Sequence, residues 1–131
     1  MAPRVVVTGG GTGIGRAVAR RFVRDGGSVV LVGRRAEVLE SAAAELRDEG
    51  GSVETFTADL RSAPAVAALA DAVVARGPVD VLVLNAGGSY GGFDDSDDLT
   101  EQLGRLADAY RADFEGNVVA TVLLGEALLP T

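Results

Sequence analysis

Short runs of valine and leucine alternate along the chain with segments of helical spacing, and this alternation limits the possible folds more than any other feature. Four runs are typical of β-strands: residues 4–8 (RVVVT), 28–33 (SVVLVG), 52–57 (SVETFT) and 79–84 (VDVLVL). After the first run, Ile14, Val18 and Phe22 recur every four residues and predict the core face of a helix. Glycines close the helical segments, as C-terminal caps do. Short strands joined by helices predict βαβ units and a parallel sheet with right-handed crossovers.

We therefore expect an α/β fold of the Rossmann-like, doubly wound type, with strand order 3-2-1-4 and no second domain in residues 1–131. The run at 79–84 is apolar at five of its six positions, which is typical of a central strand covered on both faces. Residues 118–129 are apolar nearly all round, which is typical of a buried or interface helix. In contrast, arginines 16, 20 and 24 share one helix face and are interpreted as a solvated surface rather than a binding stripe.

Composition excludes several classes of function. The net charge of -7 argues against nucleic acid as a partner, since duplex binding needs a basic face. All twelve basic residues are arginine, and the chain has no histidine or cysteine, so imidazole bases, Schiff-base lysines and thiolate or imidazole metal sites are ruled out. No apolar run approaches the roughly 20 residues of a membrane span. The first residues, MAPRVVVTGG, show no signal-peptide pattern, so we expect a cytoplasmic protein without a membrane segment.

An acidic run, Asp94, Asp95, Asp97 and Asp98, raises the possibility of a metal loop. The EF-hand spacing fails there, because Leu99 stands where a third ligand is needed. Asp98 followed by Glu101 fits a helix capping box better. We therefore expect no metal site.

The segment VVVTGGGTGIGRAVA joins the first strand to the first helix and can be compared with three phosphate-binding templates. The Walker loop fails, because Arg16 and Ala17 replace its lysine and its magnesium-binding hydroxyl. The G-x-G-x-x-G fingerprint fails at Ile14. The pattern T-G-x-x-x-G-x-G fits from Thr8 to Gly15.

Each glycine of that pattern has a physical role. Gly9 permits the tight turn off the strand, Gly13 lets the backbone approach a pyrophosphate, and Gly15 allows the helix to pack closely. The helix N-terminus offers unpaired N–H groups to an anion. We therefore expect a phosphate cradle that consists of Gly9, Gly11, Thr12, Gly13, Ile14 and Gly15.

The end of the second strand bears on which dinucleotide would bind. An NAD site places a carboxylate there for the ribose 2′-OH, whereas this chain has Gly33 followed by Arg34 and Arg35. Guanidinium groups bind a phosphate in bidentate geometry, so the sequence favours NADP(H) over NAD(H). The alternative is that both arginines merely occupy the surface before a helix.

With the glycine pattern, three further motifs give a resemblance to the short-chain dehydrogenase/reductase family: ADL at 58–60, NAG at 85–87, and Asn117 within FEGNVVATVLL. The resemblance covers nearly the whole chain and implies that residues 1–131 are the NADP-binding half of such a domain. It implies that Asp59 and Leu60 bind the adenine, that Asn85, Ala86 and Gly87 line the cofactor, and that Asn117 anchors a proton-relay water. The family usually has asparagine where this chain has Leu84.

The resemblance also implies hydride transfer between the nicotinamide and a small carbonyl or alcohol substrate, with a serine, a tyrosine and a lysine as catalytic residues. The chain has no lysine, and neither Tyr90 nor Tyr110 fits the Y-x-x-x-K motif. We therefore expect a missing C-terminal half, or a second polypeptide, to supply these residues. The alternative is a non-catalytic dinucleotide-binding or regulatory subunit. Relatives also lead us to expect a homo-oligomer through the helix at 105–129.

Overall fold

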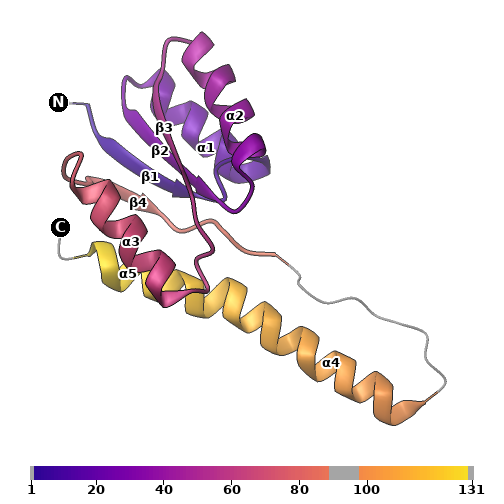
Figure 1. Cartoon of the computed structure of the whole chain (residues 1–131). Coiled ribbons are helices and arrows are strands. Elements are labelled where there is room, and N and C mark those ends of the chain that lie inside the picture. The colour runs from indigo at the N-terminus through magenta and orange to yellow at the C-terminus, as the bar shows by residue number, and fades with distance from the viewer. Residues whose placement is uncertain (1, 89–97, 130–131) are drawn as a thin grey trace.

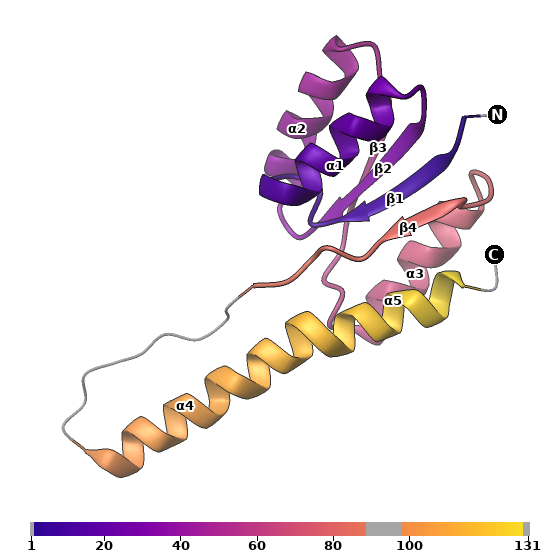
Figure 2. The ribbon, with the colours of Figure 1, turned by 180° about the vertical axis from the view of Figure 1, so that it is seen from behind.

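The computed structural model describes residues 2–88 and 98–129, which form a parallel sheet with helices on both faces (Figure 1; Figure 2). The strand order is β3-β2-β1-β4, as predicted. The strands are β1 Arg4–Thr8, β2 Ser28–Gly33, β3 Ser52–Thr57 and β4 Val81–Val83. The helices are α1 Gly13–Arg24, α2 Ala36–Asp48, α3 Ala63–Val74, α4 Leu99–Phe114 and α5 Ala120–Leu128, with a π-helical turn, Glu115–Val119, between the last two.

The first three strands have the predicted bounds, whereas β4 is shorter than predicted. It pairs Val5 with Val81 and Val7 with Val83, and within the described residues its only strand neighbour is β1. Val81 and Val83 pack against one apolar cluster and Leu82 packs against the other, but all three residues are only half-buried. The apolar pattern is typical of a central strand, whereas the order 3-2-1-4 places β4 at the edge of the described sheet. In this sheet β4 pairs along one side only, so its length is limited to the residues that take part in this one ladder with β1.

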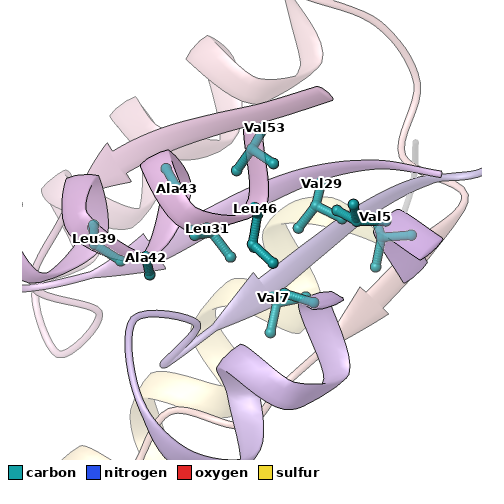
Figure 3. Close-up of a cluster of buried hydrophobic side chains, with 11 residues drawn as sticks. Val5, Val7, Val29, Leu31, Leu39, Ala42, Ala43, Leu46 and Val53 are labelled. Atoms are coloured by element: carbon teal, nitrogen blue, oxygen red, sulfur yellow. The ribbon is translucent and has the colours of Figure 1, made fainter. Parts of the chain in front are cut away.

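The valine runs of β1 and β2 are buried because both faces of the sheet are covered. Alternate residues point to opposite faces, so Val5 and Val7 meet α1 and α2 while Val6 faces α3 and α5. Figure 3 shows the first of these clusters, in which Leu46 of α2 and Val29 of β2 are labelled. These two apolar layers hold the carboxyl ends of the strands at one edge of the sheet.

The buried face of α1 differs from the prediction. The structure buries Gly15, Ala19 and Val23, whereas Ile14 is 75% exposed. The small side chains of Gly15 and Ala19 allow the helix axis to approach the sheet, which turns the row that begins with Ile14 toward the rim. The other two members of that row, Val18 and Phe22, are only partly buried.

The arginine row of α1 is a contact to α2 and not simply a solvated face. Arg20 pairs with Glu45 at 3.3 Å and with Glu49 at 2.9 Å, while Arg16 reaches Glu45 at 3.9 Å and Arg24 reaches Glu49 at 3.5 Å. These side chains are 31–66% exposed, so each pair contributes little to stability, about 1 kcal/mol or less. The row ties the two helices on one face of the sheet together.

The helix over α4 and α5 is buried only in its second half. Ala120, Leu124 and Leu128 pack into the core beside α3, while no residue of α4 is buried, and Figure 2 shows α4 extending away from the sheet. Val122 is 54% exposed, so the apolar segment 118–129 presents a second face outward. None of the helices in the described ranges is long and apolar enough to span a membrane.

Candidate functional site

A cleft of about 190 Å³ opens at the carboxyl ends of the strands, beside the point where the chain crosses from one side of β1 to the other. Open parallel sheets bind their ligands at such a position. The cleft is lined by Gly9, Gly11, Thr12, Gly33, Arg34, Arg35, Val38, Leu39, Ala58, Asp59, Leu60, Arg61, Ala86, Gly87, Gly116 and Ala120.

Most of the predicted cofactor residues line this cleft, and four do not. The structure brings together Gly9, Gly11, Thr12, Arg34, Arg35, Asp59, Leu60, Ala86 and Gly87. Gly13, Ile14, Gly15 and Asn85 lie outside the lining. Gly13 and Ile14 begin α1 at the rim, whereas Gly15 and Asn85 stand behind the glycine loop and support it.

The glycine loop is built by close backbone contacts. Gly9 has a φ of 63°, which suits glycine, and its N–H donates to the Val32 carbonyl at 2.8 Å. At Gly15 a Cβ would stand 2.2 Å from the Gly9 carbonyl oxygen and 2.7 Å from Asn85 Nδ2. Only glycine fits between α1 and the loop, as the sequence predicted for the packing of this helix.

Thr8 joins the glycine loop to the NAG segment, a role that the sequence did not reveal. Its side chain is 1% exposed, and its Oγ1 accepts hydrogen bonds from the backbone N–H groups of Asn85 at 2.9 Å and Ala86 at 2.8 Å. Oγ1 also lies 3.3 Å from the Val83 carbonyl oxygen, to which it donates. The one signal available in the sequence is a hydroxyl at the end of a strand whose three central residues are valine.

Asn117 holds the end of the NAG segment from the far side. Its Oδ1 accepts the Gly88 N–H at 2.8 Å, and its Nδ2 donates to the carbonyls of Gly88 at 2.7 Å and Asp113 at 2.8 Å. At Gly87 a Cβ would stand 2.2 Å from Asn117 Oδ1. The π-helical turn Glu115–Val119 therefore sits directly against this segment, and glycine at 87 makes room for it.

Asp59 forms a two-bond ion pair with Arg61 at the edge of the cleft. Arg61 donates from Nε to Oδ1 at 3.0 Å and from Nη2 to Oδ2 at 2.8 Å, and its backbone N–H reaches Oδ1 at 3.0 Å. These hydrogen bonds, opposed by partial burial and assisted by the charges of Arg61 and Arg34, lower the pKa of Asp59 to about 2. The carboxylate is therefore ionised throughout the physiological range.

Asp59 does not cap the helix that follows it. Instead, Ser62 precedes α3 and its Oγ accepts the Ala65 N–H at 3.3 Å. The side chain of Asp59 is directed to Arg61 instead.

The lining of the cleft is basic although the whole chain is acidic. Among the described residues that line it are three arginines, Arg34, Arg35 and Arg61, and a single acidic residue, Asp59. Apolar residues, including Val38 and Leu39, also line the cleft. Sequence reasoning missed Arg61, although it follows directly after the ADL motif. It also missed Gly116 and Ala120, whose small size allows the helix that contains them to form part of the cleft wall.

The acidic run gives no support to a metal loop within the described residues. Asp98 caps α4, because its Oδ1 accepts the N–H groups of Thr100 at 2.7 Å and Glu101 at 3.3 Å, as the capping pattern predicted. Asp94, Asp95 and Asp97 lie outside the described residues. Across residues 2–88 and 98–129, no three acidic side chains gather into a potential metal site.

A parallel sheet of order 3-2-1-4 with a glycine loop at its carboxyl edge defines a Rossmann-like α/β protein. The family model described as short chain dehydrogenase matches residues 3–131. A short chain dehydrogenase of Pseudocercospora fijiensis is 36% identical over 129 residues, which cover 96% of this chain and 39% of that protein. The chain therefore belongs to the short-chain dehydrogenase family.

Two solved structures of similar fold contain the phosphorylated cofactor. A variant of actinorhodin polyketide ketoreductase with NADPH has 35% identity and a TM-score of 0.82, covering 98% of this chain and 46% of the ketoreductase. A metagenomic short-chain oxidoreductase in complex with NADP has 36% identity and a TM-score of 0.81, covering 98% of this chain and 56% of that chain. This chain thus spans about half the length of these two proteins, and a smaller share of the curated relatives.

Proposed function

We propose that the cleft binds NADP(H) and that the chain is the cofactor-binding part of an oxidoreductase. The observation that carries the proposal is the pair of arginines, Arg34 and Arg35, that lines the cleft directly after β2, where an NAD site would have a carboxylate. The glycine loop and the start of α1 complete an anion-binding edge. The NADPH and NADP complexes of the two similar structures support the same cofactor.

Each part of the cofactor has a group of residues suited to it. The backbone around Gly11, Thr12 and Gly13 would hold the pyrophosphate at the N-terminus of α1. Asp59 and Leu60 would bind the adenine. The two arginines after β2, Arg34 and Arg35, would bind the 2′-phosphate. Ile14, Asn85, Ala86 and Gly87 would line the remainder. When bound, the nicotinamide supplies or accepts the hydride that is exchanged with a carbonyl or alcohol substrate.

The proton chemistry of such a reaction needs groups that this chain does not have. It contains no lysine, so the serine, tyrosine and lysine of the family would come from a C-terminal segment or from a second polypeptide. Asn117 would contribute by fixing Gly88 beside the nicotinamide end of the cleft. The absence of lysine also favours a second candidate, a dinucleotide-binding subunit without activity. Steady NADPH oxidation by the purified protein with a carbonyl substrate would exclude that candidate.

Replacing Arg34 with alanine should weaken NADPH binding about 10- to 100-fold, which is the equivalent of one or two charge-assisted hydrogen bonds. NADH binding should change much less, because NADH has no 2′-phosphate. Fluorescence titration with each reduced cofactor measures both dissociation constants. Arg24→Ala is the control, because Arg24 lies at the end of α1 and pairs with Glu49 away from the cleft. An equal loss for both cofactors would contradict the assignment of Arg34.

We also propose that the helix over 105–129 packs against a second copy of the chain. Tyr110, Phe114, Val118 and Val122 recur every four residues along it and are 44–66% exposed. Such a continuous apolar stripe is typical of an interface. The chain should sediment as a dimer or larger, and Phe114→Glu should shift it toward the monomer. A wild-type protein that sediments as a monomer at micromolar concentration would contradict this proposal.

A further inference from the structure

The ion pair between Arg61 and Asp59 raises a question that the proposed NADP(H) site does not answer. Among the described residues that line the cleft, Asp59 is the single carboxylate, and this cleft would receive a doubly charged phosphate. An uncompensated carboxylate there would repel the 2′-phosphate. It would also attract the Arg34 guanidinium, whose charge already acts on Asp59. The arrangement around this carboxylate therefore affects which dinucleotide binds.

Arg61 meets Asp59 in the geometry that neutralises a carboxylate best. Two parallel N–H donors, Nε and Nη2, face the two oxygens at 3.0 and 2.8 Å. The backbone N–H of Arg61 donates a third hydrogen bond, so both the main chain and the side chain of Arg61 bind Asp59. The Asp59 and Arg61 side chains are 43% and 33% exposed, and the pair lies at the border of the cleft rather than in bulk solvent.

We propose that Arg61 is a specificity-determining residue that acts through Asp59: it cancels the charge of this carboxylate, so that the carboxylate neither repels the 2′-phosphate of NADP(H) nor competes with it for Arg34. This proposal rests on the proposed function. Arg61 is thus a positioning residue for cofactor choice rather than a direct phosphate ligand.

The same geometry leaves Asp59 able to accept a ligand. A carboxylate offers about four lone-pair sites, two on each oxygen. Arg61 donates two hydrogen bonds to Oδ1 and one to Oδ2. One site on Oδ2 can therefore accept the amino group of an adenine while the ion pair stays closed. Neutralisation of Asp59 and adenine binding by it are compatible.

The test is the ratio of the NADH and NADPH dissociation constants in Arg61→Gln, measured by fluorescence titration. The NADH to NADPH ratio of dissociation constants should fall about tenfold, which is a shift in preference toward NADH. The reason is that the negative charge of Asp59 is no longer compensated and repels the 2′-phosphate at a partly exposed surface. Arg61→Lys retains the charge but not the two-bond fork, so its ratio should lie between those of the wild type and Arg61→Gln. Arg76→Gln is the matched control, because Arg76 follows α3 and pairs with Glu54 away from the cleft.

A double-mutant comparison separates an action through Asp59 from a direct contact with the phosphate. In an Asp59→Asn background the carboxylate charge is gone, so Arg61→Gln should leave the NADH to NADPH ratio unchanged. A further fall in that background would show direct phosphate binding and overturn the proposal. An unchanged ratio in both Arg61→Gln and Arg61→Lys, with a wild type that prefers NADPH, would overturn this proposal alone. A wild type that binds neither cofactor, or binds both equally, would overturn the proposed function and this inference with it.

Discussion

Replacing Gly15 with alanine should destabilise the chain by about 1–3 kcal/mol or more and abolish NADPH binding at concentrations that saturate the wild type. The added Cβ would stand 2.2 Å from the Gly9 carbonyl oxygen and 2.7 Å from Asn85 Nδ2. The first of these atoms belongs to the backbone and cannot rotate away. Either α1 moves off the sheet or the glycine loop moves, and both shifts remove the edge that would hold the pyrophosphate.

Urea unfolding followed by circular dichroism measures the stability, and fluorescence titration measures NADPH binding. The matched control is Gly104→Ala, because Gly104 is also helical but a Cβ there meets no atom within 4 Å. That variant should be stabilised by up to about 1 kcal/mol, the difference in helix propensity between glycine and alanine. If Gly15→Ala unfolds at the wild-type urea concentration and binds NADPH normally, the packing described for this loop is wrong.

Replacing Thr8 with valine should lower the free energy of unfolding by about 2–5 kcal/mol, which is the second large effect that we expect. The variant keeps the shape but removes the acceptor of two part-buried backbone N–H groups, those of Asn85 and Ala86, and each unsatisfied group costs about 1–3 kcal/mol. The segment after β4 should lose its fixed position against the glycine loop, so NADPH affinity should fall as well. Urea unfolding and the same titration measure both consequences.

Two substitutions separate the hydroxyl from other effects at this position. Thr8→Ser retains the acceptor and should recover most of the lost stability, apart from the contribution of one buried methyl group. Thr57→Val makes the same chemical change at the end of β3, where the threonine is exposed, and should be close to neutral. Equal stability of Thr8→Val and the wild type would show that Asn85 and Ala86 do not depend on this hydroxyl.

The sequence was informative about the strands because burial on both faces leaves an unambiguous pattern. The apolar runs 5–7 and 29–32 lie within the predicted strands 4–8 and 28–33, and the structure gives β1 and β2 these bounds. The face of α1 was predicted wrongly, because the helix packs through Gly15 and Ala19, whose small side chains give no apolar periodicity. The contact between Arg20 and Glu49 was also missed, since it joins residues 29 apart in the chain.

The site was predictable where it depends on local backbone chemistry. Gly9 and Gly15 have the packing roles that the spacing predicted, and Arg34 lines the cleft. What the sequence could not give is the set of hydrogen bonds between segments. Thr8 meets the NAG segment 77 residues away, and Asn117 meets Gly88 29 residues away. Such bonds depend on how the strand ends are brought together, which no single motif encodes.

The binding of NADPH and NADH to the unmodified chain tests the central claim most directly. One protein sample titrated with each reduced cofactor, at moderate and at high salt, gives the two dissociation constants. A cleft with arginines after β2 and a neutralised Asp59 should bind NADPH at least about tenfold more tightly than NADH, with the difference shrinking as salt screens the phosphate. Equal affinity for the two cofactors, tighter binding of NADH, or binding of neither would contradict the account.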